Sequence, residues 1–194
     1  MHGLIFIELK KYVESKFDSA TWEQLLEKAG QKHRFSWPPR VYPDRDILAL
    51  VTSACEMTGL TANAILEDFG EFIAPNLVEQ YKFFISPSWR LLDFLAHTDE
   101  TIHKVVRIQK GSIPPWLVAT RVADDKLVIT YTSARKMCAL LRGIVKGAAK
   151  FYKEDVTISE SRCMLLGDPE CIVTVQVALA KSDPESTLEK AAAQ

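Results

Sequence analysis

The heptapeptide "YTSARKM", residues 131–137, lies where an alternating apolar run is followed by a long amphipathic stretch. In a strand, side chains at i and i+2 leave the same face, so we expect Tyr131 and Ser133 side by side, with Arg135 near the start of the next helix. Two hydroxyl groups and a guanidinium group that converge can bind a carboxylate or a phosphate. The heptapeptide also fits a capped helix start with a surface arginine, and by itself it leaves both interpretations open.

The flanking sequence predicts the fold class. "LVATRV" and "KLVITYT", separated by "ADD", predict a hairpin, residues 134–152 predict a long helix, and "DVTISESR" with "CIVTVQVAL" predict a second hairpin around "GDPE". This order predicts a mostly antiparallel sheet with one helix inserted between its hairpins. Before "GSIPPW" the apolar residues recur at helical spacing. This spacing predicts a helix over 4–16, a helix over 21–29 with Ser19 as its cap, and helices in "RDILALVTSACEMTG", "TANAILEDFGEFIAPNLVEQYK" and "WRLLDFLAHTDETIHKVVRIQK". We expect the last helix to be broken near Thr98, whose hydroxyl can cap a new helical turn.

Composition sets the class of protein. The 194 residues are 47% hydrophobic, which is enough for one substantial domain, and the formal net charge of -1 gives no footprint for nucleic acid or an acidic membrane surface. No apolar run reaches the roughly 20 residues that span a bilayer, and the start lacks a signal-peptide pattern. We therefore expect a cytoplasmic protein with no membrane insertion and mostly reduced cysteines. We also expect no enzyme, because phosphate loops, nucleophile elbows and two-histidine zinc helices are missing from the sequence.

One of the four histidines is placed for ligand binding. In "DETIHKVVRIQ", Ile102 and Val106 mark the buried stripe of a helix, and His103 lies on its flank. A flank histidine can turn its imidazole into a pocket and bind a metal, or it can be an ordinary, partly exposed residue. We interpret Asp99 and Glu100 as first-turn residues that complement the helix dipole.

These motifs together resemble a known family. His103, "IPPW" at 113–116 and "YTSARKM" occur in the order and spacing of the H-NOX domains, which bind heme with nitric oxide or oxygen and are related to the sensor part of soluble guanylate cyclase. The opening "MHGLIFIEL" and the stretch "EDFGEF" are similar as well. The resemblance implies a sensor domain over residues 1–180, with 181–194 as a polar tail or linker. It implies an α+β fold of about seven helices and a four-stranded antiparallel sheet, with heme b buried between a helical distal half and a mixed proximal half.

The resemblance also implies roles for single residues around the heme. His103 is implied as the proximal iron ligand, and Tyr131, Ser133 and Arg135 as the residues that hold the heme propionates. The positions implied to shape the pocket are Ile5 and Pro115, which press on the porphyrin, Gly70, which lets a distal helix approach it, and Leu9, Ile73 and Leu140, which replace the hydrogen-bonding residues of oxygen-binding members.

The implied function is heme-based gas sensing. By resemblance, nitric oxide binds the ferrous iron, weakens the bond to His103 and releases its helix, and the change is passed to a histidine kinase, a cyclic-di-nucleotide enzyme or a chemotaxis receptor. Carbon monoxide is implied as a second gas that binds the iron. Two alternatives stay open, namely an oxygen-binding heme protein and a zinc or thiol redox sensor.

The alternative of a zinc or thiol redox sensor rests on the cysteines. Cys163 and Cys171 flank "MLLGDPE" and Cys138 precedes them, and some family members bind structural zinc at equivalent positions with three cysteines and a histidine. Glu160 stands at the histidine position here, and a carboxylate is a less common zinc ligand. Zinc, a disulfide or redox switch, and free thiols all remain open. Cys55 is expected to be a small buried hydrophobe.

Overall fold

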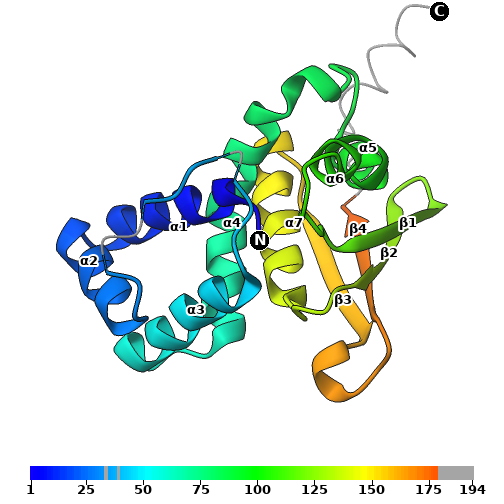
Figure 1. Cartoon of the computed structure of the whole chain (residues 1–194). Coiled ribbons are helices and arrows are strands. Elements are labelled where there is room, and N and C mark those ends of the chain that lie inside the picture. Colours follow the sequence, from blue (N-terminus) through cyan, green and yellow to red (C-terminus); the bar gives the residue numbers. More distant parts are fainter. Residues whose placement is uncertain (33–34, 39, 179–194) are drawn as a thin grey trace, which may run out of the picture.

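A computed structural model describes residues 1–32, 35–38 and 40–178. Its first half is helical and its second half combines a sheet with one long helix (Figure 1). The tail expected over 181–194 lies outside the described residues. The elements in chain order are α1 (Gly3–Lys16), α2 (Ser19–Lys28), α3 (Asp44–Thr58), α4 (Ala62–Gln80), η1 (Lys82–Phe84), α5 (Leu91–His97), η2 (Asp99–His103), α6 (Lys104–Arg107), β1 (Trp116–Ala123), β2 (Lys126–Thr132), α7 (Cys138–Tyr152), β3 (Val156–Arg162), η3 (Met164–Leu166) and β4 (Cys171–Val177).

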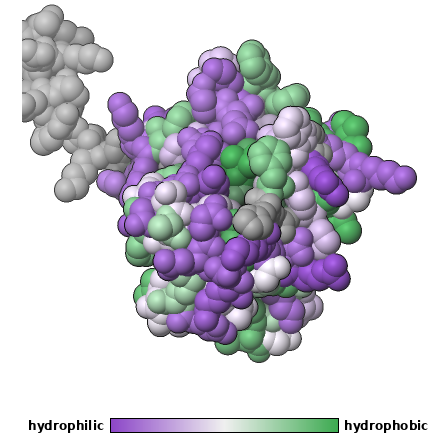
Figure 2. Space-filling model, turned by 60° about the vertical axis from the view of Figure 1, so that its left-hand side comes forward, coloured by the Kyte–Doolittle hydropathy of each residue, from purple (hydrophilic) through white to green (hydrophobic). Residues whose placement is uncertain are grey.

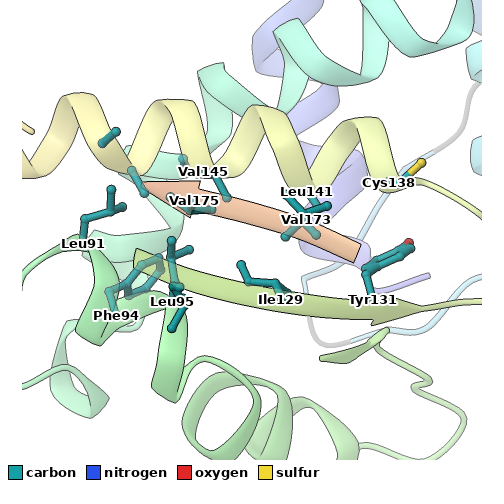
Figure 3. Close-up of a cluster of buried hydrophobic side chains, with 14 of the residues drawn as sticks. Leu91, Phe94, Leu95, Ile129, Tyr131, Cys138, Leu141, Val145, Val173 and Val175 are labelled. Atoms are coloured by element: carbon teal, nitrogen blue, oxygen red, sulfur yellow. The ribbon is translucent and has the colours of Figure 1, made fainter. Parts of the chain in front are cut away.

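The sheet confirms the predicted hairpins. Its order is β1-β2-β4-β3, and every neighbouring pair is antiparallel. Helix α7 connects the two hairpins and packs across one face of the sheet, so α5, β2 and β4 turn their apolar side chains toward it (Figure 3). This α+β arrangement confirms the fold class expected from the sequence.

Three details of the helix ends differ from expectation. Helix α2 is capped by Asp18, whose Oδ1 accepts from the Thr21 N–H at 2.7 Å, rather than by Ser19. The break near Thr98 is present, but the Thr98 hydroxyl donates to the Phe94 carbonyl at 2.8 Å and does not cap the following turn. Helix α7 begins at Cys138 instead of residue 134, because the chain first makes a turn in which Lys136 has a φ of 52°.

The apolar core has two parts that meet along α4 and α7. One part fills the space among α1 to α4, and the other lies between the sheet and the helices α5 and α7. The two long helices cross closely because glycines line the crossing: a Cβ on Gly143 would lie 2.0 Å from the Glu67 carbonyl oxygen, and one on Gly147 would lie 2.3 Å from that of Glu71. In Figure 1 these helices run side by side through the middle of the molecule.

The outer surface on the side of α1 to α3 is mainly hydrophilic, with separate apolar spots (Figure 2). Among the described residues, no helix combines the length and the apolar character that crossing a membrane requires.

Candidate functional site

A cavity of about 190 Å³ lies between the two halves of the protein. The first residues of the chain, α1 and the end of α4 line one side, and the segment from α5 to α6, strands β1 and β2, and α7 line the other. Most of the lining is apolar, with Ile5, Pro115 and Leu140 among its members. A few polar groups, including His103 and Arg135, reach the same space. Such a cavity suits a largely apolar ligand that carries a small number of charged groups.

His103 enters this cavity from a π-helical turn. Residues Asp99–His103 form the turn, and the His103 N–H bonds to the Thr98 carbonyl at 3.0 Å. Such turns are rare and often mark functional sites. The His103 side chain is only 15% exposed, and its Nδ1 lies 3.1 Å from Asp99 Oδ1. Sequence reasoning thus found the ligand candidate, but it missed the contact with Asp99, which was interpreted only as a dipole partner.

The contact with Asp99 fixes the state of the imidazole. Burial raises the pKa of Asp99, but hydrogen bonds from Arg107 and His103 outweigh this effect and leave the pKa below its usual value. An ionised carboxylate only accepts, so the Nδ1 of His103 carries the hydrogen and Nε2 keeps a free lone pair. Burial also lowers the pKa of His103 and outweighs the effect of Asp99. A neutral, oriented imidazole in a cavity is the form that binds iron or another metal.

Arg135 already binds a carboxylate in this structure. Its side chain is 9% exposed, and its Nη1 donates to Asp44 Oδ2 at 3.0 Å while its Nη2 donates to the Ile113 carbonyl at 2.7 Å. The α-amino group of Met1 donates to the other oxygen of Asp44 at 2.7 Å. The guanidinium is therefore largely buried at the cavity, where it can bind an anion, and is not the surface group of the alternative interpretation.

Tyr131 and Ser133 do part of what the capping interpretation expects. The Tyr131 hydroxyl accepts from the Met137 N–H at 3.2 Å, and Ser133 Oγ accepts from the Arg135 N–H at 3.3 Å. Both residues are buried, and Tyr131 lies at the end of β2 beside the first residues of α7 (Figure 3). Tyr131 lines the cavity, and burial raises the pKa of its phenol, which stays a neutral donor. Ser133 does not line the cavity, and its hydrogen bond from the Arg135 N–H stabilises the turn between β2 and α7.

Gly70 has a packing role that the sequence did not reveal. We expected this glycine to let a distal helix approach the heme, which stays a prediction, and Gly70 is not among the residues that line the cavity. A Cβ at Gly70 would instead lie 2.5 Å from the Leu140 carbonyl oxygen and 2.9 Å from the Ile144 nitrogen. The missing side chain therefore serves the close crossing of α4 and α7.

The three positions expected to lack a hydrogen-bond donor are all apolar and packed. Leu140 lines the cavity, Leu9 lines a small adjoining space of about 10 Å³, and Ile73 is fully buried in the helical core. Four polar lining residues were missed, namely His2, Tyr81, Thr98 and Ser112. Tyr81 at the end of α4 lines the cavity with a pKa raised by burial, and so does His2, whose Nδ1 accepts from the Leu4 N–H at 3.3 Å. No spacing signal in the sequence connects any of these residues to this site.

A second cluster lies beside the start of α7. The Sγ atoms of Cys138, Cys163 and Cys171 and a carboxylate oxygen of Glu160 all lie within 4.8 Å of one another. The cysteines are free thiols, and Cys138 Sγ lies 3.7 Å from Cys163 Sγ. Burial raises the pKa of Cys138, and that of Cys171 to about 12. Cys55 lies elsewhere and is partly exposed rather than buried.

One carboxylate oxygen of this cluster has no protein partner. Glu160 Oε2 accepts from Arg142 Nη1 at 2.9 Å, whereas the buried Oε1 has no hydrogen-bond partner. A buried oxygen without a partner is costly, and a metal ion beside three thiols would satisfy it. The donor set therefore fits a tetrahedral divalent metal.

A family model described as "Haem-NO-binding" matches residues 2–160. No curated protein gives a significant match.

Among solved structures, an H-NOX protein from S. oneidensis in the Fe(II)NO ligation state is similar at a TM-score of 0.85 and 20% identity, covering 92% of this chain and 100% of the other. The I5F mutant of T. tengcongensis H-NOX is similar at a TM-score of 0.81 and 24% identity, covering 92% of this chain and 98% of the other. The H103G mutant of an H-NOX domain from Shewanella oneidensis, in the Fe(II)CO ligation state, is similar at a TM-score of 0.81 and 20% identity. This match covers 94% of this chain and 100% of the other. At these identities the likeness establishes a shared fold.

Proposed function

The chain belongs to the Haem-NO-binding family of heme-based gas-sensor domains, and from this premise we propose that it binds heme b in the central cavity and senses nitric oxide. The observation that carries the proposal is the pairing of His103 and Arg135 at one cavity. A neutral imidazole suits iron, and a buried guanidinium suits the propionates of a heme whose body is apolar. When bound, ferrous heme supplies an iron atom that binds nitric oxide or carbon monoxide.

The residues of the site fit this cofactor. Nε2 of His103 has a free lone pair because Asp99 fixes the hydrogen on Nδ1. Arg135 holds the Asp44 carboxylate, which has the chemistry of a propionate, and the Tyr131 phenol is a neutral donor in the same lining. Ile5 and Pro115 line the cavity, where we propose that they press on the porphyrin.

The segment that carries His103 has few fully buried residues. Ile102 is the one buried residue between Asp99 and Arg107, and α6 has none. A segment with few buried contacts belongs to the least stable part of a fold, so a small change at His103 can displace it. We propose that His103 gives up its ligand contact when nitric oxide binds and that the freed segment shifts against the helical half.

The signal then needs a receiver. We propose that a histidine kinase, a cyclic-di-nucleotide enzyme or a chemotaxis receptor reads this shift, and that the protein acts as a sensor rather than as a catalyst. This assignment rests on the family and on the displaceable segment.

Absorption spectroscopy tests the proposal. The protein is purified with heme, reduced without oxygen, and measured alone, with nitric oxide, with carbon monoxide and in air. We expect a five-coordinate ferrous spectrum that changes with nitric oxide and carbon monoxide and forms no stable oxygen complex. A persistent oxygen complex would favour the oxygen-binding alternative, and failure to retain heme would exclude the proposal.

The thiol cluster supports a second, structural role. We propose that Cys138, Cys163, Cys171 and Glu160 bind zinc beneath the start of α7, because their ligand atoms converge and Glu160 Oε1 has no other partner. Burial raises the pKa of Cys138 and of Cys171 and keeps these two thiols protonated until a metal binds, so uptake of zinc releases their protons.

A further inference from the structure

Asp99 is shared between His103 and Arg107. The His103 Nδ1 lies 3.1 Å from Asp99 Oδ1, and Arg107 Nη2 donates to the same oxygen at 2.6 Å. A short hydrogen bond from a charged guanidinium is stronger than a longer bond from a neutral imidazole. Arg107 therefore withdraws negative charge from the oxygen that His103 uses, and Asp99 is left as a weakened acceptor.

Arg107 is itself held in place from two directions. Its Nη1 lies 3.4 Å from the Asp99 carbonyl oxygen, and its guanidinium lies over the Trp116 ring, 4.8 Å from the centroid. Trp116 begins β1, so the position of the guanidinium depends on the sheet as well as on its own helical turn. The three side chains at 99, 103 and 107 form a connected network behind the cavity.

A hydrogen bond from Nδ1 to a carboxylate makes an imidazole a stronger ligand, because negative character is passed through the ring to Nε2. We propose that Asp99 and Arg107 set the strength of the bond from His103 to iron in opposite directions, Asp99 strengthening it and Arg107 weakening it. The inference rests on the proposed function, since it takes His103 as the ligand. Both are positioning residues that act through His103 and do not touch the iron.

A purely structural role gives a different expectation. If Asp99 and Arg107 only hold the turn against α6, removing either side chain loosens the same segment. Both substitutions then shift the strength of the bond from His103 to iron in the same direction. If they tune the ligand, Asp99→Asn weakens the acceptor, whereas Arg107→Met returns full charge to Asp99 and keeps an apolar stem over Trp116. The two changes then have opposite signs.

The test measures the iron–histidine stretching frequency of the ferrous, heme-loaded full chain by resonance Raman spectroscopy. We expect the frequency to fall in Asp99→Asn, to rise in Arg107→Met, and to stay unchanged in Lys104→Met. Lys104 is an exposed cation on the same segment, so this variant controls for the loss of a positive charge. Nitrogen NMR of the heme-free wild type is expected to show the hydrogen of the His103 ring on Nδ1.

The outcomes separate the inference from the function it rests on. Shifts of opposite sign support the inference, and the rise in Arg107→Met supports it even if Asp99→Asn fails to fold. Shifts of equal sign, or no shift in a protein that retains heme, overturn the inference and leave the proposed function intact. Wild-type protein without an iron–histidine stretch overturns the proposed function instead.

Discussion

Arg135 and Asp44, which are 91 residues apart in sequence, are joined by a hydrogen bond of 3.0 Å from Nη1 to Oδ2. Asp44 begins α3 in the helical half, and Arg135 lies in the turn between β2 and α7 in the other half. The bond therefore connects the two halves at the cavity. A ligand carboxylate at Arg135 would compete with Asp44 for the guanidinium or join it, and binding there would change a contact that holds the halves together.

Removing the guanidinium should weaken heme binding. In Arg135→Ala the cofactor loses a charged partner, which we expect to cost roughly 2 to 5 kcal/mol of binding free energy, or at least about 25-fold in affinity. Heme titration of the heme-free protein measures this change. Arg45→Ala is the matched control, because Arg45 follows Asp44 in sequence and its side chain is 87% exposed. Equal affinity in Arg135→Ala and wild type would remove the propionate role.

Removing the imidazole should abolish most heme retention. In His103→Gly the iron has no protein nitrogen ligand, and added imidazole should restore binding by supplying one. The heme-to-protein ratio after purification, with and without imidazole, measures the effect. His97→Gly makes the same substitution at an exposed histidine six residues earlier in the chain and should retain heme. A normal five-coordinate ferrous spectrum of His103→Gly without imidazole would show that another residue binds the iron.

Gas selectivity should follow from the apolar distal positions. Bound oxygen is held well only when a hydrogen-bond donor meets it, and Leu9, Ile73 and Leu140 have none to offer. We expect Leu140→Tyr to allow weak oxygen binding, because nothing at Leu9 or Ile73 orients the new hydroxyl. The absorption spectrum of the reduced variant in air, compared with that of wild type, measures it.

Tyr81 provides the control for this experiment, because its phenol also lines the cavity. If wild-type protein forms an oxygen complex that disappears in Tyr81→Phe, then Tyr81 is the donor and the distal assignment is wrong.

The thiol cluster should bind one zinc ion per chain. Metal analysis after purification under reducing conditions measures the content, which we expect to be lost in Cys163→Ser and retained in Cys55→Ser. Removing the metal leaves Glu160 Oε1 without a partner, so the melting temperature should fall on treatment with a chelator. Protein that takes up no added zinc while its thiols are reduced would show that the cysteines are simply free.

Much of the fold could be predicted from the sequence, because local patterns decide local structure. Alternation of apolar residues predicted both hairpins, and helical spacing predicted the helices that precede the sheet and the one that lies between its hairpins. The ends were less predictable, since Asp18 and Ser19 are both good caps. The backbone decides between them, because Asp18 is still extended and Ser19 is already helical. The start of α7 moved to Cys138 because a turn at Lys136 comes first.

The sequence by itself determined which residues we propose for this site, and the tertiary structure decided what each of them contacts. His103, Arg135 and Tyr131 could be selected from motif spacing and all three line one cavity. The carboxylate partner of Arg135 could not be selected in this way, because Asp44 reaches Arg135 only after the two halves pack. Gly70 shows the same limit. The sequence indicated that this position needs a residue without a side chain, but the contact of Gly70 with α7 depends on how α4 crosses α7. Contacts between distant segments are set by packing of the whole chain, which no local pattern records.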